Sequence, residues 1–130
     1  MIIYTHEDCL KKFNGNGHPE KKERLDSIIN SIKSSNLKAN FREAPLVDLE
    51  IVSLVHPKEH IKNIFSNIPK KGIIGVEKEP YADTMLCPNS ENAILRSCGA
   101  GIAAVNDLMK NNEIAFCAVR PPGHHAEKNK

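Results

Sequence analysis

The chain has 130 residues, of which 40% are hydrophobic, and it carries a formal net charge of +2. This length and composition are typical of one small globular domain and argue against a disordered chain. The 18 basic and 16 acidic residues are interspersed along the sequence, so no basic patch indicates binding to nucleic acid or to a membrane.

The chain opens on a predicted strand and a predicted helix. Ile2–Tyr4 is β-branched and aromatic, which is typical of a strand, and a loop rich in glycine and asparagine follows. The helix is predicted to begin at Pro19, which suits a first helical position, with Glu20 placing negative charge in the first turn. Its apolar residues have helical spacing: Leu25, Ile28, Ile29 and Ile32. Three shorter elements are then predicted: a strand over 41–43, a helix over 48–55 and a helix that begins at Pro57.

A long helix is predicted in the second half of the chain. Residues 69–88, rich in glycine, proline and charge, are predicted to form an irregular surface excursion before it. The segment 89–91 (Asn-Ser-Glu) then offers N-cap chemistry. One face of the helix carries apolar residues: Ile94, Cys98, Gly101 or Ile102, Val105, and Leu108 or Met109. The small residues between 99 and 104 would let this helix approach a neighbouring sheet closely.

Residues 114–119 form a continuous apolar run without polar alternation, which predicts a strand buried on both faces of a parallel sheet. Short strands that alternate with helices indicate an α/β architecture. In such sheets ligands gather beyond the carboxyl ends of the strands. We therefore expect the functional site in the segment that follows Val119.

The cysteines indicate a reducing compartment. They are widely spaced, with no C-x-x-C pair and no spacing typical of a disulfide framework: Cys9, Cys87, Cys98 and Cys117. We interpret them as reduced thiols of a cytoplasmic protein, with Cys98 and Cys117 as small buried hydrophobes inside apolar stretches. The N-terminal residues lack the pattern of a secretory signal, and no apolar stretch approaches the length of a transmembrane helix.

Two adjacent histidines follow the last predicted strand, in the sequence Arg-Pro-Pro-Gly-His-His over 120–125. Because an imidazole titrates near neutral pH, His124 and His125 are candidates for acid–base catalysis. The two prolines fix φ and stiffen the loop, whereas Gly123 accepts backbone angles and close approaches that other residues do not. An isolated pair of histidines is more often a surface feature near a chain end, but this setting favours a functional role.

The motif over 120–126 resembles the tandem-histidine loop of the zinc-dependent deacetylases, the histone deacetylase and acetylpolyamine amidohydrolase family. Three further motifs resemble this family in the same order: His18-Pro19-Glu20 with Arg24-Leu25, Leu54-Val55-His56 with His60, and Asp83-Thr84 followed by Gly99-Ala100. Tyrosine is more common in relatives at the position of His60. The resemblance covers residues 1–130 as one partial domain, the N-terminal part of a three-layer arginase/deacetylase-like fold with a parallel sheet flanked by helices.

The resemblance implies hydrolysis of acetyl-lysine or of a small acetylated amine by a water bound to Zn²⁺. His125 would be the general base and then the acid to the leaving amine, and His124 would lie beside the metal-bound water and stabilise developing charge. Asp83 and Gly123 would contact the substrate. In relatives the zinc ligands are an Asp-x-His pair and a later aspartate, and none of the five aspartates of this chain has a histidine two positions later. We therefore expect no metal ligand in these residues and no turnover by this chain alone.

Two alternatives stay open. A non-catalytic remnant or an interaction module of the same fold would keep the surface without the reaction. The string from His56 to His60 matches the H-x-x-E-H of inverted zinc proteases, but Pro57 places His56 at the helix entrance and such enzymes need a further acidic ligand downstream. We favour structural roles for both histidines, with His60 largely solvated, and for Arg24 and Arg120.

The last predicted strand also has a consequence for association. Relatives supply further strands after the tandem-histidine loop, and without them a sheet edge and an apolar face are exposed. We expect this chain to be marginally stable or prone to aggregation unless it pairs with itself or with a separately encoded C-terminal remainder.

Overall fold

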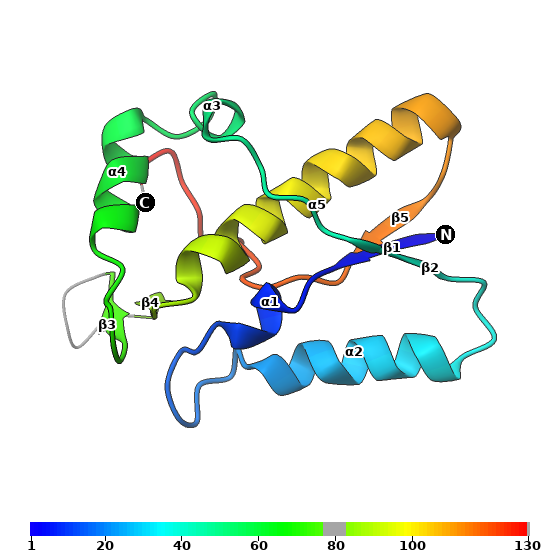
Figure 1. The fold of residues 1–130 in the computed structure, drawn as a ribbon, viewed down its shortest axis with the longest axis horizontal. Helices are drawn as coiled ribbons and strands as arrows, with labels where there is room; N and C mark the ends of the chain where they lie inside the picture. The colour runs from blue at the N-terminus through cyan, green and yellow to red at the C-terminus, as the bar shows by residue number, and fades with distance from the viewer. Residues whose placement is uncertain (77–82, 130) are drawn as a thin grey trace.

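A three-stranded parallel sheet lies at the centre of the computed structural model, which describes residues 1–76 and 83–129. β1 (Ile2–Thr5) is its middle strand, between β2 (Asn40–Glu43) and β5 (Ala115–Cys117) (Figure 1). The remaining elements are α1 (Asp8–Lys11), α2 (Lys22–Ser34), α3 (Leu49–Val52), α4 (Lys58–Ser66), β3 (Ile74–Gly75), β4 (Met85–Leu86) and α5 (Ser90–Asn111). The α/β prediction is confirmed.

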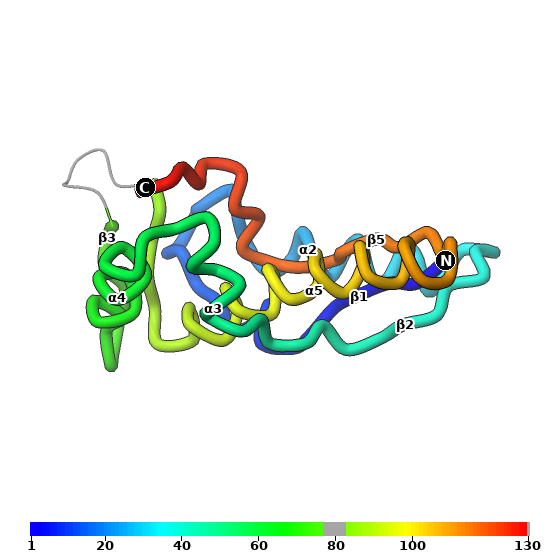
Figure 2. Tube along the Cα trace, turned by 90° about the horizontal axis from the view of Figure 1, so that it is seen from above, coloured from blue at the N-terminus to red at the C-terminus, as the bar shows by residue number. Residues whose placement is uncertain are grey.

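The helices α5 and α2 cover opposite faces of this sheet, as Figures 1 and 2 show. Successive side chains of a strand point to opposite faces. Ile2 and Tyr4 of β1 therefore pack with Ala100 of α5, whereas Ile3 packs with Leu25 of α2. The result is the three-layer arrangement predicted for the fold.

The buried face of α5 carries its small residues. Ala93, Gly99 and Ala100 are buried, and a Cβ built on Gly99 would lie 1.9 Å from the carbonyl oxygen of Pro45. The larger apolar residues of the predicted stripe lie on the surface instead: Cys98, Ile102, Val105, Leu108 and Met109. The close approach of this helix to the sheet is confirmed, and the stripe points away from it.

This packing predicts opposite effects for two glycines of the same helix. Gly99→Ala should lower the free energy of unfolding by about 1–3 kcal/mol, the usual cost of overpacking, because the new methyl group meets the backbone of Pro45. Gly101→Ala should raise it by about 0.5–1 kcal/mol, since no atom lies within 4 Å of a Cβ there and alanine is the better helix former. Urea unfolding of both variants measures the difference, and equal midpoints would contradict the close contact at Gly99.

The last strand differs from its prediction. β5 is shorter than 114–119 and lies at the edge of the described sheet, and Phe116 points outward with 43% of its surface exposed. Full burial on both faces is therefore wrong for this strand. Phe116 instead lines an open apolar cavity of about 430 Å³ together with Met1, Ile28 and Leu37. The exposed edge and apolar face expected for this chain are present.

Two local predictions need correction. Residues 69–88 are not wholly irregular, because β3 pairs antiparallel with β4 and Leu86 is buried; residues 77–82 of that stretch lie outside the described part. Asn89 occupies the N-cap of α5 without a side-chain cap bond, and the Oγ of Ser90 accepts the backbone N–H of Cys87. The residue types at these positions indicate turns and a helix cap, but tertiary contacts decide which groups their backbone and side chains bind.

The cysteines are free thiols, and their burial differs from the prediction. Cys9 and Cys87 are buried, whereas Cys98 is exposed and Cys117 is half-buried. Burial raises the pKa of the Cys9 thiol, which keeps it protonated near neutral pH. Cys98 lies in an apolar stretch, but the stretch belongs to the exposed face of α5.

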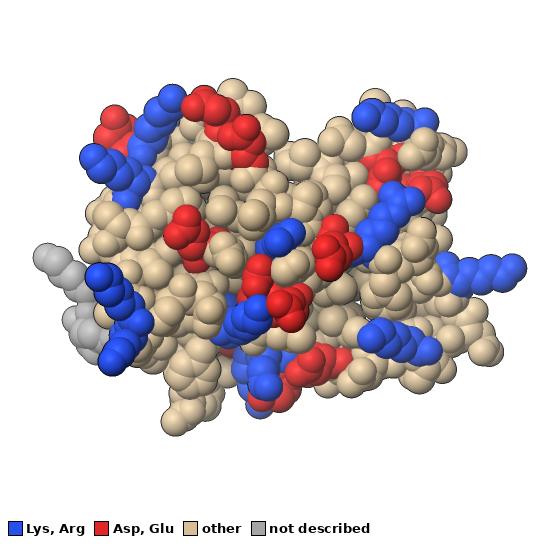
Figure 3. Space-filling view, in the orientation of Figure 1, with Lys and Arg blue, Asp and Glu red and all other residues tan. Residues whose placement is uncertain are grey.

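The surface carries both signs of charge without a single-sign patch on the face shown in Figure 3. Across the described residues, no helix combines the length and the hydropathy needed to span a membrane.

Candidate functional site

The tandem-histidine loop leaves the sheet directly after β5. The backbone N–H of Ala118 donates to the carbonyl of Tyr4 at 2.8 Å, which continues the contact with β1 beyond the strand. The peptide bond between Arg120 and Pro121 is cis. The hydroxyl of Ser97, on α5, donates to the carbonyl oxygen of Pro121 at 2.6 Å. Hydrogen bonds thus hold the loop to both the sheet and α5 just before the histidines.

A tight turn presents the two histidines. Gly123 has a φ of 71°, a conformation that L side chains rarely adopt, and its carbonyl accepts the N–H of Ala126 at 3.0 Å. His124 and His125 occupy the middle of this turn, with ring centroids 4.0 Å apart and both residues exposed. A Cβ on Gly123 would meet nothing within 4 Å. Two neighbouring imidazoles at an open turn can accept and donate protons at adjacent positions.

Asp83 lies beside this turn, although it belongs to a different segment. Its Oδ2 is 3.9 Å from Nε2 of His125, so the two groups form an ion pair when the imidazole is protonated. Its Oδ1 is 3.6 Å from Nε2 of His18, and its carbonyl oxygen is 3.2 Å from the same nitrogen. The structure therefore brings together two predicted site residues, Asp83 and His125, and adds His18.

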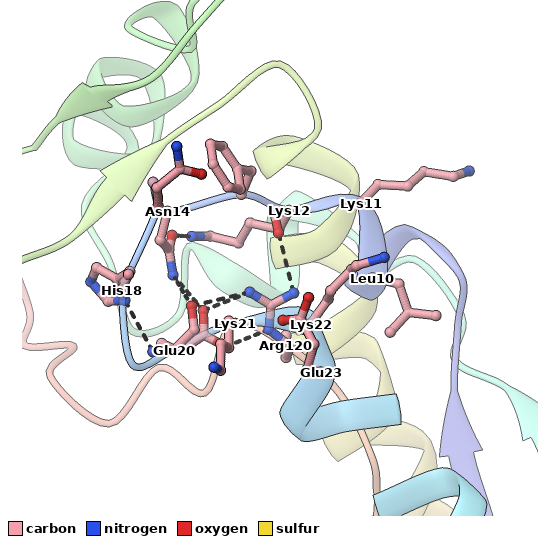
Figure 4. A pocket seen from close by; sticks show the side chains of 14 residues that line it. Leu10, Lys11, Lys12, Asn14, His18, Glu20, Lys21, Lys22, Glu23 and Arg120 are labelled. Carbon is pink, nitrogen blue, oxygen red and sulfur yellow. Dashed lines mark hydrogen bonds and ion pairs between the residues drawn. The ribbon is translucent and has the colours of Figure 1, made fainter. Parts of the chain in front are cut away.

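Arg120 organises the base of the site, as predicted. Only 4% of its surface is exposed, and its guanidinium forms a two-point ion pair with the carboxylate of Glu20, in which Nη2 lies 2.9 Å from Oε2 (Figure 4). Its Nη1 donates to the carbonyls of Cys9 at 2.9 Å and Lys12 at 3.2 Å. Arg24, by contrast, is exposed.

Glu20 has a different role from the one predicted. α2 begins at Lys22, so the Glu20 carboxylate does not lie in a helical turn but faces Arg120 and the side-chain amide of Asn14. Burial by itself raises the pKa of Glu20, but the hydrogen bond and charge of Arg120, with help from Lys12 and Asn14, bring the pKa below its ordinary value. The sequence motif that contains Glu20 resembles the deacetylase family, but the pairing of Glu20 with Arg120 is not predicted by it.

The lowered pKa of Glu20 predicts loss of stability in acid. A carboxyl whose pKa is lower in the folded than in the unfolded state stabilises the fold above the unfolded pKa of about 4.3, and this contribution is lost as the pH falls from there through the folded pKa. Glu20→Gln should therefore be less stable than the wild type at pH 7, and the gap should narrow below pH 4. Urea midpoints measured from pH 7 to pH 3 check this, and a constant gap would contradict it.

Lys12 is a buried residue that sequence reasoning missed. Its Nζ donates to the side chain of Asn14 and, at 3.2 Å, to the carbonyl of Met85. Burial lowers the pKa of the Lys12 ammonium group. A cavity of about 470 Å³ lies next to it, lined also by His18 and Arg120 but not by the tandem histidines (Figure 4). Nothing in the local sequence distinguishes Lys12 from the exposed lysines around it.

The residues present do not fit a zinc ion. In the described ranges, 1–76 and 83–129, no three His, Cys, Asp or Glu side chains are close enough to hold one metal ion. The rings of His56 and His60 lie 5.5 Å apart, and Nδ1 of His56 is 3.1 Å from the carbonyl of Lys128. Both histidines are half-buried, so the prediction that His60 is largely solvated is wrong.

The fold and the loop define an α/β protein with a candidate acid–base site at the carboxyl end of a parallel strand. Its known relatives agree. The sequence profile described as the histone deacetylase domain matches residues 18–130, and the chain belongs to this family.

Two curated relatives are 32% identical to this chain, and each match covers 96% of it. One is a type-2 histone deacetylase 2 of Dictyostelium discoideum, of which 9% is covered, and the other is a probable deacetylase of Archaeoglobus fulgidus, of which 34% is covered. The chain thus spans about a third or less of their length.

Two solved structures show the same fold. The HDA15 HD domain superimposes with a TM-score of 0.85 at 22% identity, over 98% of this chain and 36% of that one. An acetylpolyamine aminohydrolase from Burkholderia pseudomallei has a TM-score of 0.75 at 16% identity, over 99% of this chain and 47% of that one. The predicted deacetylase-like fold is confirmed.

Proposed function

We propose that this chain supplies the acid–base loop of a cytoplasmic deacetylase that hydrolyses acetyl-lysine or a small acetylated amine. The observation that carries the proposal is the position of His125, on a fastened turn at the end of β5 and 3.9 Å from the carboxylate of Asp83. Family membership supports the reaction type. The names of the relatives, deacetylases and an acetylpolyamine aminohydrolase, support an acetylated substrate.

In this proposal, the two histidines divide the work of proton transfer. His125 takes a proton from the attacking water at an imidazole nitrogen and returns it to the leaving amine. His124, whose ring lies beside it at a tilt of 47°, stabilises the charge that develops on the attacked carbonyl group. Asp83 accepts N–H groups of the substrate, and the open space around Gly123 lets the substrate approach the rings.

The zinc of the family has to be held by residues outside the described set, since the described ones do not fit it. When bound, a zinc ion supplies a Lewis acid that polarises the carbonyl and lowers the pKa of water. We infer that this chain alone does not turn over substrate and becomes active only when a further part of the domain completes the site.

A chimera tests this function. The chain replaces the matching third of the probable deacetylase of Archaeoglobus fulgidus, and acetate release is measured with an acetyl-lysine peptide and with an acetylated polyamine. We expect release by the chimera in the presence of zinc and none by the chain alone. A folded, zinc-loaded chimera that releases no acetate from either substrate would contradict the proposal, provided that the parent protein is active in the same assay.

A second candidate is an interaction module without the reaction, and the exposed apolar surfaces favour it. Phe116 and Ile114 at β5, and Val105 and Met109 on α5, expose between 43% and 78% of their surface. We infer that either a further part of the domain or a second copy of this chain covers them. An inactive chimera combined with a dimer measured by light scattering would favour the module over the enzyme.

A further inference from the structure

The backbone around Asp83 is held at three successive carbonyl groups. The carbonyl of Asp83 lies 3.2 Å from Nε2 of His18, that of Thr84 accepts the N–H of Val76 at 2.8 Å, and that of Met85 accepts the ammonium group of Lys12 at 3.2 Å. Two of these three contacts come from one N-terminal segment, residues 12–18. That segment thus fixes the backbone position from which the Asp83 side chain extends.

The hydrogen bonds of His18 define its tautomer. Its Nδ1 accepts the backbone N–H of Glu20 at 3.0 Å, so this nitrogen carries a lone pair. The ring proton of the neutral imidazole must then lie on Nε2, which donates it to the carbonyl of Asp83.

The same short segment also holds the tandem-histidine loop. Glu20, two residues after His18, forms the ion pair with Arg120, and Arg120 directly precedes the loop that carries His125 (Figure 4). Residues 18–20 therefore contact the Asp83 loop at one end and the base of the histidine loop at the other. The Asp83 side chain is itself 71% exposed, so burial does not hold it in place.

We propose that His18 is a positioning residue, whose Nε2–H group holds Asp83 opposite His125. This inference rests on the proposed function, in which Asp83 binds the N–H groups of the substrate. His18 would set the distance between Asp83, which binds the substrate, and His125, which deprotonates the attacking water. His18 itself would not touch the substrate. The geometry assigns this role through the contact of His18 with the backbone carbonyl of Asp83. This contact does not depend on which substrate is bound.

Nuclear magnetic resonance of the chain with ¹⁵N-labelled histidine tests the tautomer without any need for turnover. We expect the two ring nitrogens of His18 to give the separate signals of a neutral ring protonated on Nε2 at pH 8. Ring nitrogens that average between tautomers, or a proton on Nδ1, would overturn the proposal. An inactive chimera together with the Nε2–H signal would reject the proposed function and leave the His18 contact standing.

Variants of His18 test whether the contact positions the loop. His18→Ala should speed hydrogen exchange of the Val76 amide, which binds the neighbouring carbonyl of Thr84, by about tenfold, the ratio that corresponds to one hydrogen bond of about 1.4 kcal/mol. It should also shift the ring signals of His125. His18→Gln, whose side-chain N–H can still reach the carbonyl, should restore both readouts at least in part.

The matched control is His60→Ala, on α4, whose ring contacts His56 and not the site. It should leave Val76 exchange and the His125 signals unchanged. Unaltered exchange and unaltered signals in His18→Ala would overturn the positioning role. If His18→Ala does not fold, His18→Gln decides alone. It should keep the Val76 exchange rate and the His125 signals at or near their wild-type values, and loss of both would contradict the proposal.

Discussion

Replacement of Arg120 by leucine is expected to cost about 3–5 kcal/mol of the free energy of unfolding, the range found when one partner of a buried ion pair is removed. Arg120 has 4% of its surface exposed, and its guanidinium neutralises Glu20. The change also removes the hydrogen-bond donor of the Cys9 and Lys12 carbonyls. Buried carbonyls that lose their donor add to the cost. Urea unfolding followed by circular dichroism measures the loss.

Arg42 provides the matched control for this variant. Its guanidinium is 3.0 Å from Asp107 and 3.7 Å from Glu113, but its side chain is 40% exposed. Water screens such a pair, so Arg42→Leu should change the midpoint much less than Arg120→Leu does. Equal midpoints for the two variants would show that the Arg120 pair does not stabilise the fold more than an exposed pair does.

His125→Ala is expected to lower acetate release by the chimera by about 10²–10⁴-fold, the usual contribution of a general acid–base residue. The effect should appear in kcat more than in KM, because the imidazole takes part in proton transfer in the transition state and not in substrate binding. The zinc content should stay the same, since the described residues of this chain do not form a metal site. Steady-state kinetics and metal analysis of the same preparation measure both quantities.

His60→Ala is the control for this second prediction too, since it removes an imidazole whose ring contacts His56 rather than Asp83. Its kinetics should match those of the unaltered chimera. Full activity in His125→Ala would remove His125 from the role of base. A loss of zinc in that variant would instead indicate that His125 supports the metal site.

The sequence predicted the elements that have strong local patterns. The β-branched start of the chain and the segment around Phe41 are strands, as predicted, and the small residues near Gly99 allow close packing. The buried face of α5 was not predictable from periodicity, because its large apolar residues form as regular a stripe as its small ones do. The backbone of Pro45 leaves no room for a side chain at position 99, so the stripe of small residues faces inward there.

The candidate site was predicted in part for a similar reason. His124 and His125 are adjacent in sequence, and their loop has a composition that is recognisable by itself. The contacts that hold the loop join residues from distant parts of the chain, such as Glu20 with Arg120 and His18 with Asp83. Sequence alone carries no signal for such pairs. A charged residue near a helix start, such as Glu20, is usually assigned a role at the helix terminus instead.

The central position of β1 also constrains the order of folding. A strand made first has β2 beside it early, but its other neighbour, which places Ala115 next to Ile2, comes from the opposite end of the chain. During synthesis at about 5–20 residues per second, the first strand waits several seconds with one side uncovered. Contacts between such distant residues slow folding. The nascent chain therefore depends on β5 to complete the surroundings of a strand that was synthesised long before it.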